Sequence, residues 1–420
     1  MQVPRPLRSP DVTGTGEADV PVPCPPRAPD APGAGKVAAR VPRPLRALDA
    51  IRTAAHRTDA ATPAGRDRAV DALRAVAILG VVLGHWLVTA LVADGGALRT
   101  ASPLHFMPWL APISWAFQTL AVFFLVGGHV ATKGYASARA RGVTYGRWLG
   151  TRLARLFRPV VAMVALWTVA ACCLLLSGAD TGTVHTLVKL ALSPLWFLLV
   201  LAVLTAATPL LARLNPLWPL AVVLHVDLVR FGLGGPSWLG WLNLPAGWLV
   251  PYTLGAAWTR GELEGRRAGR VLLVGGAAAT AALVAWAGYP ASMVGVPGAP
   301  VSNLDPPTLA AVTFGVAQCG LALLLREPLR RLMRRRLLWA AVALVNLSAM
   351  TIFLWHQTAL MATTATGLLA GRLPGLHTVP DGPVWVAARL VWLPVLALGL
   401  ALCLSAFRTW EQPYGSTRST

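Results

Sequence analysis

Long apolar segments separated by short polar loops dominate this sequence and leave little choice of fold. Each segment is near the length of about 20 residues that crosses a bilayer as a helix. Ten segments are found at approximately 72–92, 110–131, 157–178, 194–212, 216–233, 237–258, 270–289, 308–326, 338–370 and 384–407. Only 13% of the residues are charged, about half of the share that is typical of a soluble domain. We therefore predict an all-α, polytopic membrane protein with about ten transmembrane helices.

The basic residues are concentrated in alternate loops. Seven lie at 133–158 without an acidic residue, four lie at 260–270 and six lie at 326–336. The loops between them carry few basic residues, namely Arg99, Lys189 and Arg372. The positive-inside rule then predicts that both termini are cytoplasmic. This topology explains most of the net charge of +20, so we expect the lipid bilayer, and no nucleic acid, as a partner.

Residues 1–65 differ in composition from the rest of the chain. They are rich in Pro, Ala, Gly and Arg and contain no apolar core of a signal peptide. We predict a disordered cytoplasmic tail at 1–65, a ten-helix membrane domain at 66–410 and a short cytoplasmic tail at 411–420. The five cysteines lack metal-ligand spacing, so no metal site is predicted. The sequence also contains no nucleotide-binding loop, which argues against ATP-driven transport.

The first apolar segment carries two ionisable residues on one face. Arg74 and His85 are eleven positions apart, which returns them to nearly the same helical direction, about 16 Å apart along the axis. An ionisable residue inside a bilayer is costly and indicates a functional site by default. The structural alternative is a histidine that is hydrogen-bonded between two helices.

The stretch from Asp67 to His85 resembles the first transmembrane helix of the membrane-bound acyltransferase 3 family. That helix carries an Arg, ten further residues and a His, and Arg74 and His85 match it position by position. Four more stretches resemble motifs of the family in the same order, namely FFLVGGHVATKGY at 123–135, RLARLFRP at 152–159, PLWFL at 194–198 and MTIFLWH at 350–356. The resemblance covers about 65–410. One departure is the absence of an acidic residue soon after PLWFL, where many relatives have one.

This resemblance implies a membrane acyltransferase that depends on acyl-CoA. Members of the family transfer an acyl group, commonly acetyl, from cytoplasmic acyl-CoA to a hydroxyl or an amine. We therefore expect a multi-pass protein of the plasma membrane, with acyl-CoA as the donor substrate and no permanently bound cofactor. The expected acceptor is a glycan, a lipid-linked molecule or a small secondary metabolite. The sequence leaves the oligomeric state open.

The chemistry of acyl transfer suggests roles for the matched residues. His85 is the expected general base, because imidazole accepts a proton near neutral pH. We expect Arg74 on the same face and His356 at a similar depth, in a polar cavity that opens toward the cytosol. His356 has a structural alternative, which is to bridge two helices.

Three arginines that precede the third segment are candidates for binding CoA. Guanidinium groups bind phosphates through charge-assisted hydrogen bonds, and CoA carries a pyrophosphate and a 3′-phosphate. The expected residues are Arg152, Arg155 and Arg158. The alternative is that these side chains contact lipid phosphates and serve only as topology signals.

Charged residues within the later segments are candidates for the acceptor side. Asp227 and Arg230 are three positions apart and predict either an intramembrane ion pair or a binding site for the acceptor. Arg389 is costly unless it is paired, and we expect Asp381 or Asp227 as its partner.

Two other functions fit a multi-pass protein of this composition. A transporter or flippase with an intramembrane ionic relay predicts internal repeats and interrupted helices at matching positions, and no convincing repeat is found. A non-catalytic membrane scaffold is favoured by the missing acidic residue after PLWFL. The register of Arg74 with His85 and the arginines before the third segment favour the acyltransferase.

Overall fold

The structure, a computed structural model, describes residues 43–95 and 97–407. The chain divides into two units, Met1–Leu48 and Asp49–Thr420, and every contact discussed below lies within the second. Residues 43–60 of the predicted tail form helix α1 (Arg43–Ala60). Residues 1–42 of that tail, and the predicted tail at 411–420, lie outside the described residues.

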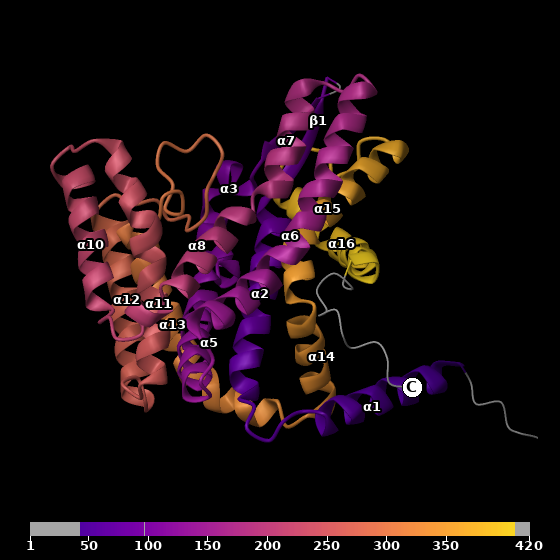
Figure 1. The fold of residues 1–420 in the computed structure, drawn as a ribbon. Helices are drawn as coiled ribbons and strands as arrows, with labels where there is room; N and C mark the ends of the chain where they lie inside the picture. The colour runs from indigo at the N-terminus through magenta and orange to yellow at the C-terminus, as the bar shows by residue number, and fades with distance from the viewer. Residues whose placement is uncertain (1–42, 96, 408–420) are drawn as a thin grey trace, which may run out of the picture. The chain divides into compact units, whose positions relative to one another are not determined.

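Helices make up most of the described chain, in agreement with the predicted class (Figure 1). The longer ones are α2 (Arg68–Val88), α5 (Leu120–Ala140), α6 (Tyr145–Leu176), α11 (Asn243–Thr259), α12 (Arg266–Trp286), α13 (Leu309–Leu332), α15 (Ala349–Gly367) and α16 (Pro383–Phe407). The shorter ones are α3 (Pro103–Phe106), α4 (Ala111–Ser114), α7 (Thr181–Leu192), α8 (Leu195–Ala206), α9 (Thr208–Leu211), α10 (Leu217–Asp227) and α14 (Arg336–Leu347).

The number of candidate membrane spans is lower than predicted. In the described part of the chain, seven helices are long and apolar enough, namely Arg68–Val88, Pro108–Ala140, Tyr145–Leu176, Thr181–Ala206, Arg266–Trp286, Leu309–Leu332 and Pro383–Phe407. The pair Arg336–Leu347 and Ala349–Ala370, bent by 75°, is an eighth if it counts as one span. The predicted ten spans are therefore not confirmed. The helices α10 and α11, in the predicted segments 216–233 and 237–258, contain only 11 and 17 residues.

The first apolar segment is not helical over its whole length. Helix α2 ends at Val88, and the chain continues as strand β1 (Ala90–Asp94), which pairs antiparallel with β2 (Ala97–Ala101). The sequence Asp-Gly-Gly at 94–96 is a hairpin signal, and Gly95 has a φ of 54°, which glycine tolerates best. His85 therefore lies one turn before the end of its helix rather than at the middle of a span.

The N-terminal end of α2 is fixed by carboxylates. Asp67 caps the helix, with its side chain accepting from the backbone N–H of Ala69, and pairs with Arg326 of α13 at 2.9 Å. Partial burial favours the neutral carboxyl, but the hydrogen bond and charge of Arg326 outweigh it and lower the pKa of Asp67 below its ordinary value. Asp71 accepts two hydrogen bonds from Arg66, at 2.6 and 3.2 Å. These contacts tie the start of α2 to α13 and to the preceding loop.

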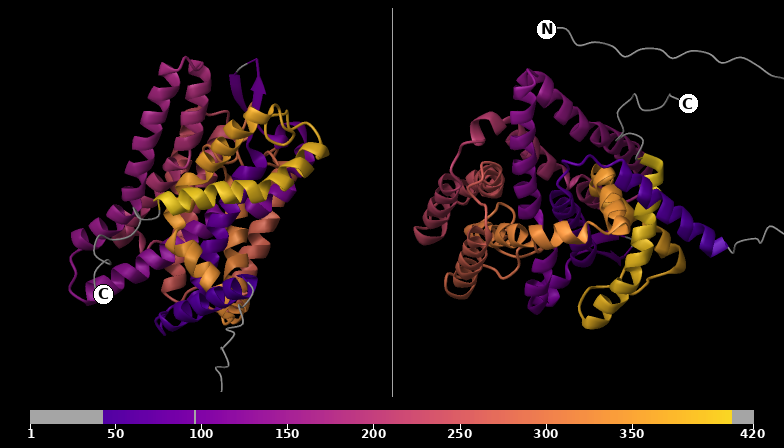
Figure 2. Two further views of the ribbon diagram at one scale, coloured as in Figure 1. Left: turned by 90° about the vertical axis from the view of Figure 1, so that its right-hand side faces the viewer. Right: turned by 90° about the horizontal axis from the view of Figure 1, so that it is seen from below.

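The interior of the helical assembly depends on close helix contacts. A Cβ on Gly128 of α5 would lie 2.0 Å from the carbonyl oxygen of Tyr252 on α11, so only glycine permits this approach. Helix α5 also contacts α2, and α16 lies across α2 and α15 (Figure 2). As a result, α2 packs against other helices on most of its surface, and its C-terminal end leads into the hairpin.

Two neighbouring glycines of α12 provide a matched test of this packing. A Cβ on Gly276 would lie 2.5 Å from the backbone nitrogen of Ala317 on α13, whereas a Cβ on Gly275 would meet no atom within 4 Å. We expect Gly276→Ala to lower the free energy of unfolding by about 1–3 kcal/mol, because α12 and α13 have to move apart. Gly275→Ala has no such cost. Thermal unfolding of the purified protein in detergent measures both, and equal midpoints would contradict the close contact.

Candidate functional site

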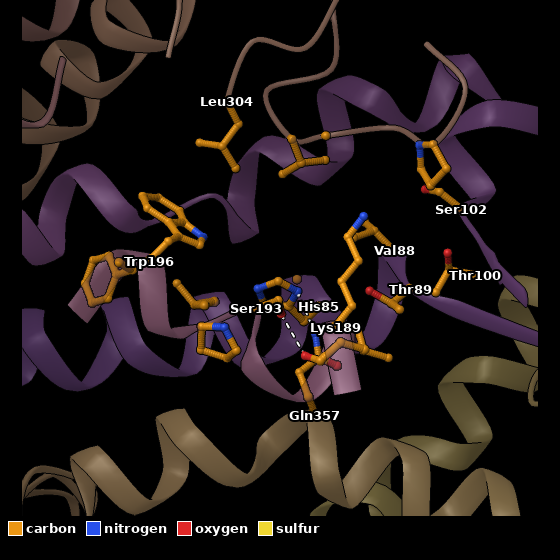
Figure 3. Close-up of a pocket in the computed structure, with 18 of the residues that line it drawn as sticks. His85, Val88, Thr89, Thr100, Ser102, Lys189, Ser193, Trp196, Leu304 and Gln357 are labelled. Carbon is orange, nitrogen blue, oxygen red and sulfur yellow. Dashed lines mark hydrogen bonds between the residues drawn. The ribbon is translucent and has the colours of Figure 1, made fainter. Parts of the chain in front are cut away.

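A cavity of about 600 Å³ lies at the C-terminal end of α2 (Figure 3). Its wall comes from α2, β2, the turn at 115–117, α7, the start of α8, the loop at 294–304 and α15. Hydroxyl and amide side chains and several aromatic rings face it, and no acidic residue is among the described residues that line it. Such a cavity has the size and mixed character of a site for a polar organic molecule.

The long loop between α12 and α13 covers part of this cavity and is anchored by an asparagine. Asn303 is fully buried, and its Nδ2 donates to the carbonyl oxygens of Pro290 at 2.6 Å and Ser292 at 3.0 Å. The hydroxyl of Thr308, which caps α13, donates to Asn303 Oδ1 at 2.6 Å. Side-chain hydrogen bonds thus order a loop that has little regular structure of its own.

The imidazole of His85 lies on the cavity wall. Its Nδ1 is 3.1 Å from Nε2 of Gln357 on α15. Its ring centroid is 5.1 Å from that of His356, the residue before Gln357. The structure therefore brings together two histidines that are far apart in the sequence, as expected from their similar predicted depth.

His356 is fully buried and is held by its own helix. Its Nδ1 lies 2.7 Å from the carbonyl oxygen of Phe353, which can only accept, so Nδ1 carries the proton of the neutral ring. Its Nε2 has no hydrogen-bond partner among the described residues. The indole of Trp86 donates to the carbonyl oxygen of His356 at 3.0 Å. Consecutive residues of α2 thus contact consecutive residues of α15.

Gln357 determines which nitrogen of His85 carries a proton. An amide NH₂ at Nδ1 donates and leaves the proton on Nε2, whereas an amide oxygen accepts from Nδ1–H and leaves Nε2 as a free base. Heavy-atom positions are the same for the two orientations of the amide. Gln357 is fully buried, and its Oε1 has no partner among the described residues. Half a turn of the amide would place this oxygen at Nδ1 and produce the basic form of the His85 Nε2.

Arg74 does not share the cavity with His85. It lies nearly three turns earlier on α2 and is not among the lining residues. The cavity is instead lined by His185 and Lys189, which belong to a loop on the side opposite the cytosol in the predicted topology. The expectation of one cavity that holds both residues is therefore wrong, because the walls that close around His85 come from the segments at the C-terminal end of α2.

A second polar region surrounds Arg74. It lies within electrostatic range of Asp71 and of Arg152 on α6. The guanidinium of Arg152 packs against Gly134 of α5 and lies 4.9 Å from the ring centroid of Trp148. The indole N–H of Trp148 is buried and has no acceptor among the described residues. Two guanidinium groups and a free donor are thus gathered near the N-terminal end of α2.

The other two arginines of the predicted CoA site lie elsewhere. Arg155 and Arg158 are exposed on α6, whereas Arg152 is partly buried. Their exposed positions suit contact with lipid phosphates as well as with a ligand. Arg152 is the one for which an electrostatic interaction with Arg74 is found among the described residues.

Asp227 is satisfied by its own surroundings. Only 2% of its surface is exposed, and its carboxylate accepts from the side chains of Asn243 at 2.8 Å and Tyr289 at 3.0 Å, and from the backbone N–H of Leu309 at 2.7 Å. Arg230 lies at 3.8 Å, which is the predicted ion pair. None of these residues lines the cavity. The arrangement favours a structural role over binding of the acceptor.

Arg389 supports the cavity wall from behind. It is fully buried, donates to the carbonyl oxygen of Thr89 and lies 5.0 Å from the ring of Trp385. Thr89 lines the cavity, but Arg389 itself does not. The expected pairing with Asp381 or Asp227 is not found, because a backbone carbonyl at the end of α2 accepts from the guanidinium instead.

Three residues of the cavity are missed by sequence reasoning. Gln357 directly follows a recognised motif, but only the contact with His85 shows its importance. Lys189 reads as an ordinary loop cation, and Trp196 reads as part of a packing motif. Both line the cavity because α7 and α8 fold back toward the end of α2.

A family model described as an acyltransferase domain matches residues 67–408. The chain belongs to the acyltransferase 3 family. It is therefore a membrane acyltransferase, and the resemblance read from the sequence is confirmed. The matched region extends from the cap of α2 to the end of α16 and includes the cavity as well as the second polar region. Comparisons with curated proteins and with solved structures gave no match.

Proposed function

We propose that this acyltransferase moves an acyl group from acyl-CoA to a hydroxyl of an acceptor in the cavity, with His85 as the general base. The observation that carries this proposal is the imidazole of His85 on the wall of a 600 Å³ cavity, on the helix that bears the Arg and His pattern. No other described residue of the cavity wall is an imidazole with a side-chain partner at one of its ring nitrogens.

The proposed reaction is a direct acyl transfer. The acceptor oxygen attacks the carbonyl carbon of the thioester while its proton passes to Nε2 of His85, and the new C–O bond forms. The C–S bond then breaks, and the CoA thiolate takes the proton back from the imidazolium. The imidazole is neutral before and after the reaction, so the base is regenerated in each cycle. An amide oxygen of Gln357 at Nδ1–H stabilises the imidazolium formed in between.

Arg74 and Arg152 are the proposed partners of the CoA phosphates. Two guanidinium groups close together repel each other, and an anion between them relieves this repulsion. The indole N–H of Trp148 adds an unused donor. The pantetheine arm of CoA separates its phosphates from its thioester, which fits phosphates at Arg74 and a thioester near His85. Arg155 and Arg158 contribute charge at the surface.

The remaining features of the substrates rest on the family. We propose acetyl as the acyl group, a glycan, a lipid-linked molecule or a small metabolite as the acceptor class, and the plasma membrane as the location. A transporter with an ionic relay is less well supported, because Asp227 is satisfied by its neighbours and Arg389 is engaged by a backbone carbonyl.

Replacing His85 tests the proposed base. We expect His85→Ala to reduce the transfer of labelled acetyl from acetyl-CoA by about 10²–10⁴-fold, the usual contribution of a general base. Membranes that contain the protein and their native acceptors provide the assay. His105→Ala is the control, because His105 is exposed near the same end of the molecule and does not line the cavity. Equal labelling by His85→Ala and wild type would remove His85 from the reaction.

Two substitutions of Gln357 test the orientation of the imidazole. Gln357→Glu presents only acceptor oxygens to Nδ1–H, so we expect transfer to persist. Gln357→Met keeps the size of the side chain but loses the contact, and we expect about a tenfold to hundredfold lower rate. Thermal midpoints of both variants report any loss of packing. If the two variants are equally impaired at equal stability, Gln357 does not act by fixing the proton.

The pair Arg152→Ala and Arg155→Ala tests the donor site. We expect Arg152→Ala to raise the KM for acetyl-CoA by about 10–100-fold, because a charge-assisted hydrogen bond to phosphate is lost. Arg155→Ala is expected to have a smaller effect, since its side chain is exposed. Initial rates at several acetyl-CoA concentrations give both constants. An unchanged KM in Arg152→Ala would exclude the assignment.

A further inference from the structure

In its described part, the cavity wall carries a positive charge and no negative charge. Lys189 is the single lysine or arginine among the described residues that line the cavity, and no aspartate or glutamate lines it. Lys189 forms no ion pair with the described part of the chain. Asp180 caps the start of α7 by accepting from the backbone N–H of Thr183 at 2.8 Å. The ammonium group therefore faces the cavity without a counter-charge from the protein.

The position of Lys189 does not follow from membrane topology. In the predicted topology Lys189 belongs to a loop that faces away from the cytosol, where the positive-inside rule requires no cation. A lysine that only anchors a helix at the lipid interface would extend toward lipid headgroups. Lys189 instead lines the cavity together with His185, one turn earlier on the same face of α7. In Figure 3 its side chain extends beside Thr89 and Val88 into the cavity.

An aromatic surface lies on the other side of His85. Trp196 lines the cavity, is 36% exposed and packs on Trp248, with ring centroids 5.9 Å apart. In the view of Figure 3, Trp196 and Lys189 lie on opposite sides of His85. A partly exposed indole on the wall of a cavity with both polar and apolar lining offers a flat apolar surface, which suits the C–H face of a sugar ring.

We propose that the acceptor is an anionic saccharide, with its acidic group at Lys189, its ring on Trp196 and the reacting hydroxyl at His85. The volume of about 600 Å³ accommodates a molecule of this size. The acidic group is a carboxylate or a phosphate, and the phosphate belongs either to the sugar or to a lipid headgroup. This assignment rests on the proposed function, since it takes the cavity as the acceptor site.

Binding of matched sugars tests the charge preference without requiring acyl transfer. The probes are methyl glucuronide, glucose 6-phosphate and uncharged methyl glucoside, titrated calorimetrically into the full chain in uncharged detergent. We expect at least one anionic sugar to bind about tenfold or more tightly than the glucoside, because a charge-assisted hydrogen bond forms. If neither anionic sugar binds more tightly than methyl glucoside, the proposal is overturned.

Variants assign the preference to Lys189. We expect Lys189→Met to bind all three sugars equally and Lys189→Arg to retain the preference. Arg99→Gln is the matched control, because Arg99 is exposed on β2 beside Thr100 but does not line the cavity. A preference that survives in Lys189→Met, or that is lost in Arg99→Gln, would overturn the role of Lys189.

Two further comparisons identify the source of the anion and separate this proposal from the reaction. The titrations are repeated in bilayers of phosphatidylcholine with or without phosphatidylglycerol, and competition by the anionic lipid supports a lipid-linked phosphate. The absence of competition by the anionic lipid supports a soluble or glycan-borne anion. His85→Ala should keep the preference for anions. A wild-type protein that prefers anionic sugars but transfers no acyl group would contradict the proposed reaction alone.

Discussion

The contact between α2 and α15 is the constraint on which the rest of the site depends. Inside a bilayer no water satisfies polar groups, so they have to find partners within the protein. His85 meets Gln357, and Trp86 donates to the carbonyl oxygen of His356. These two contacts fix the height and rotation of one helix against the other. Both helices contribute to the cavity wall, and Arg389 holds the C-terminal end of α2 by donating to the carbonyl oxygen of Thr89.

The sequence predicts this pair of helices better than it predicts the cavity. Periodicity is a local property, so the common face of Arg74 and His85 can be read from the chain alone. The importance of MTIFLWH is indicated by its resemblance to a motif of the family. The opening of the cavity depends on which distant segments cover the end of α2. The hairpin, α7 and the loop held by Asn303 provide that cover. No local pattern specifies those long-range contacts, and for this reason the expectation that Arg74 and His85 share one cavity is wrong.

The arginines illustrate a related limit. Arg152, Arg155 and Arg158 are equivalent as positive-inside signals, and spacing alone does not rank them as ligands of CoA. The tertiary structure separates Arg152 from the other two, because a Cβ on Gly134 would clash with the Arg152 guanidinium, whereas Arg155 and Arg158 are exposed. The charged pair of Asp227 and Arg230 could be predicted from its spacing. Its other partners, Tyr289 and the start of α13, come from remote parts of the chain.

The separation of the two polar regions along α2 has a mechanistic consequence. In the proposed reaction, the two guanidinium groups near the start of the helix hold the phosphates of the donor, and the imidazole near its end acts where the thioester reacts. The same proposal lets the thioester reach His85 from one end of the helix while the acceptor hydroxyl enters from the other. Both substrates are then bound at once, and direct transfer needs no acyl-enzyme intermediate.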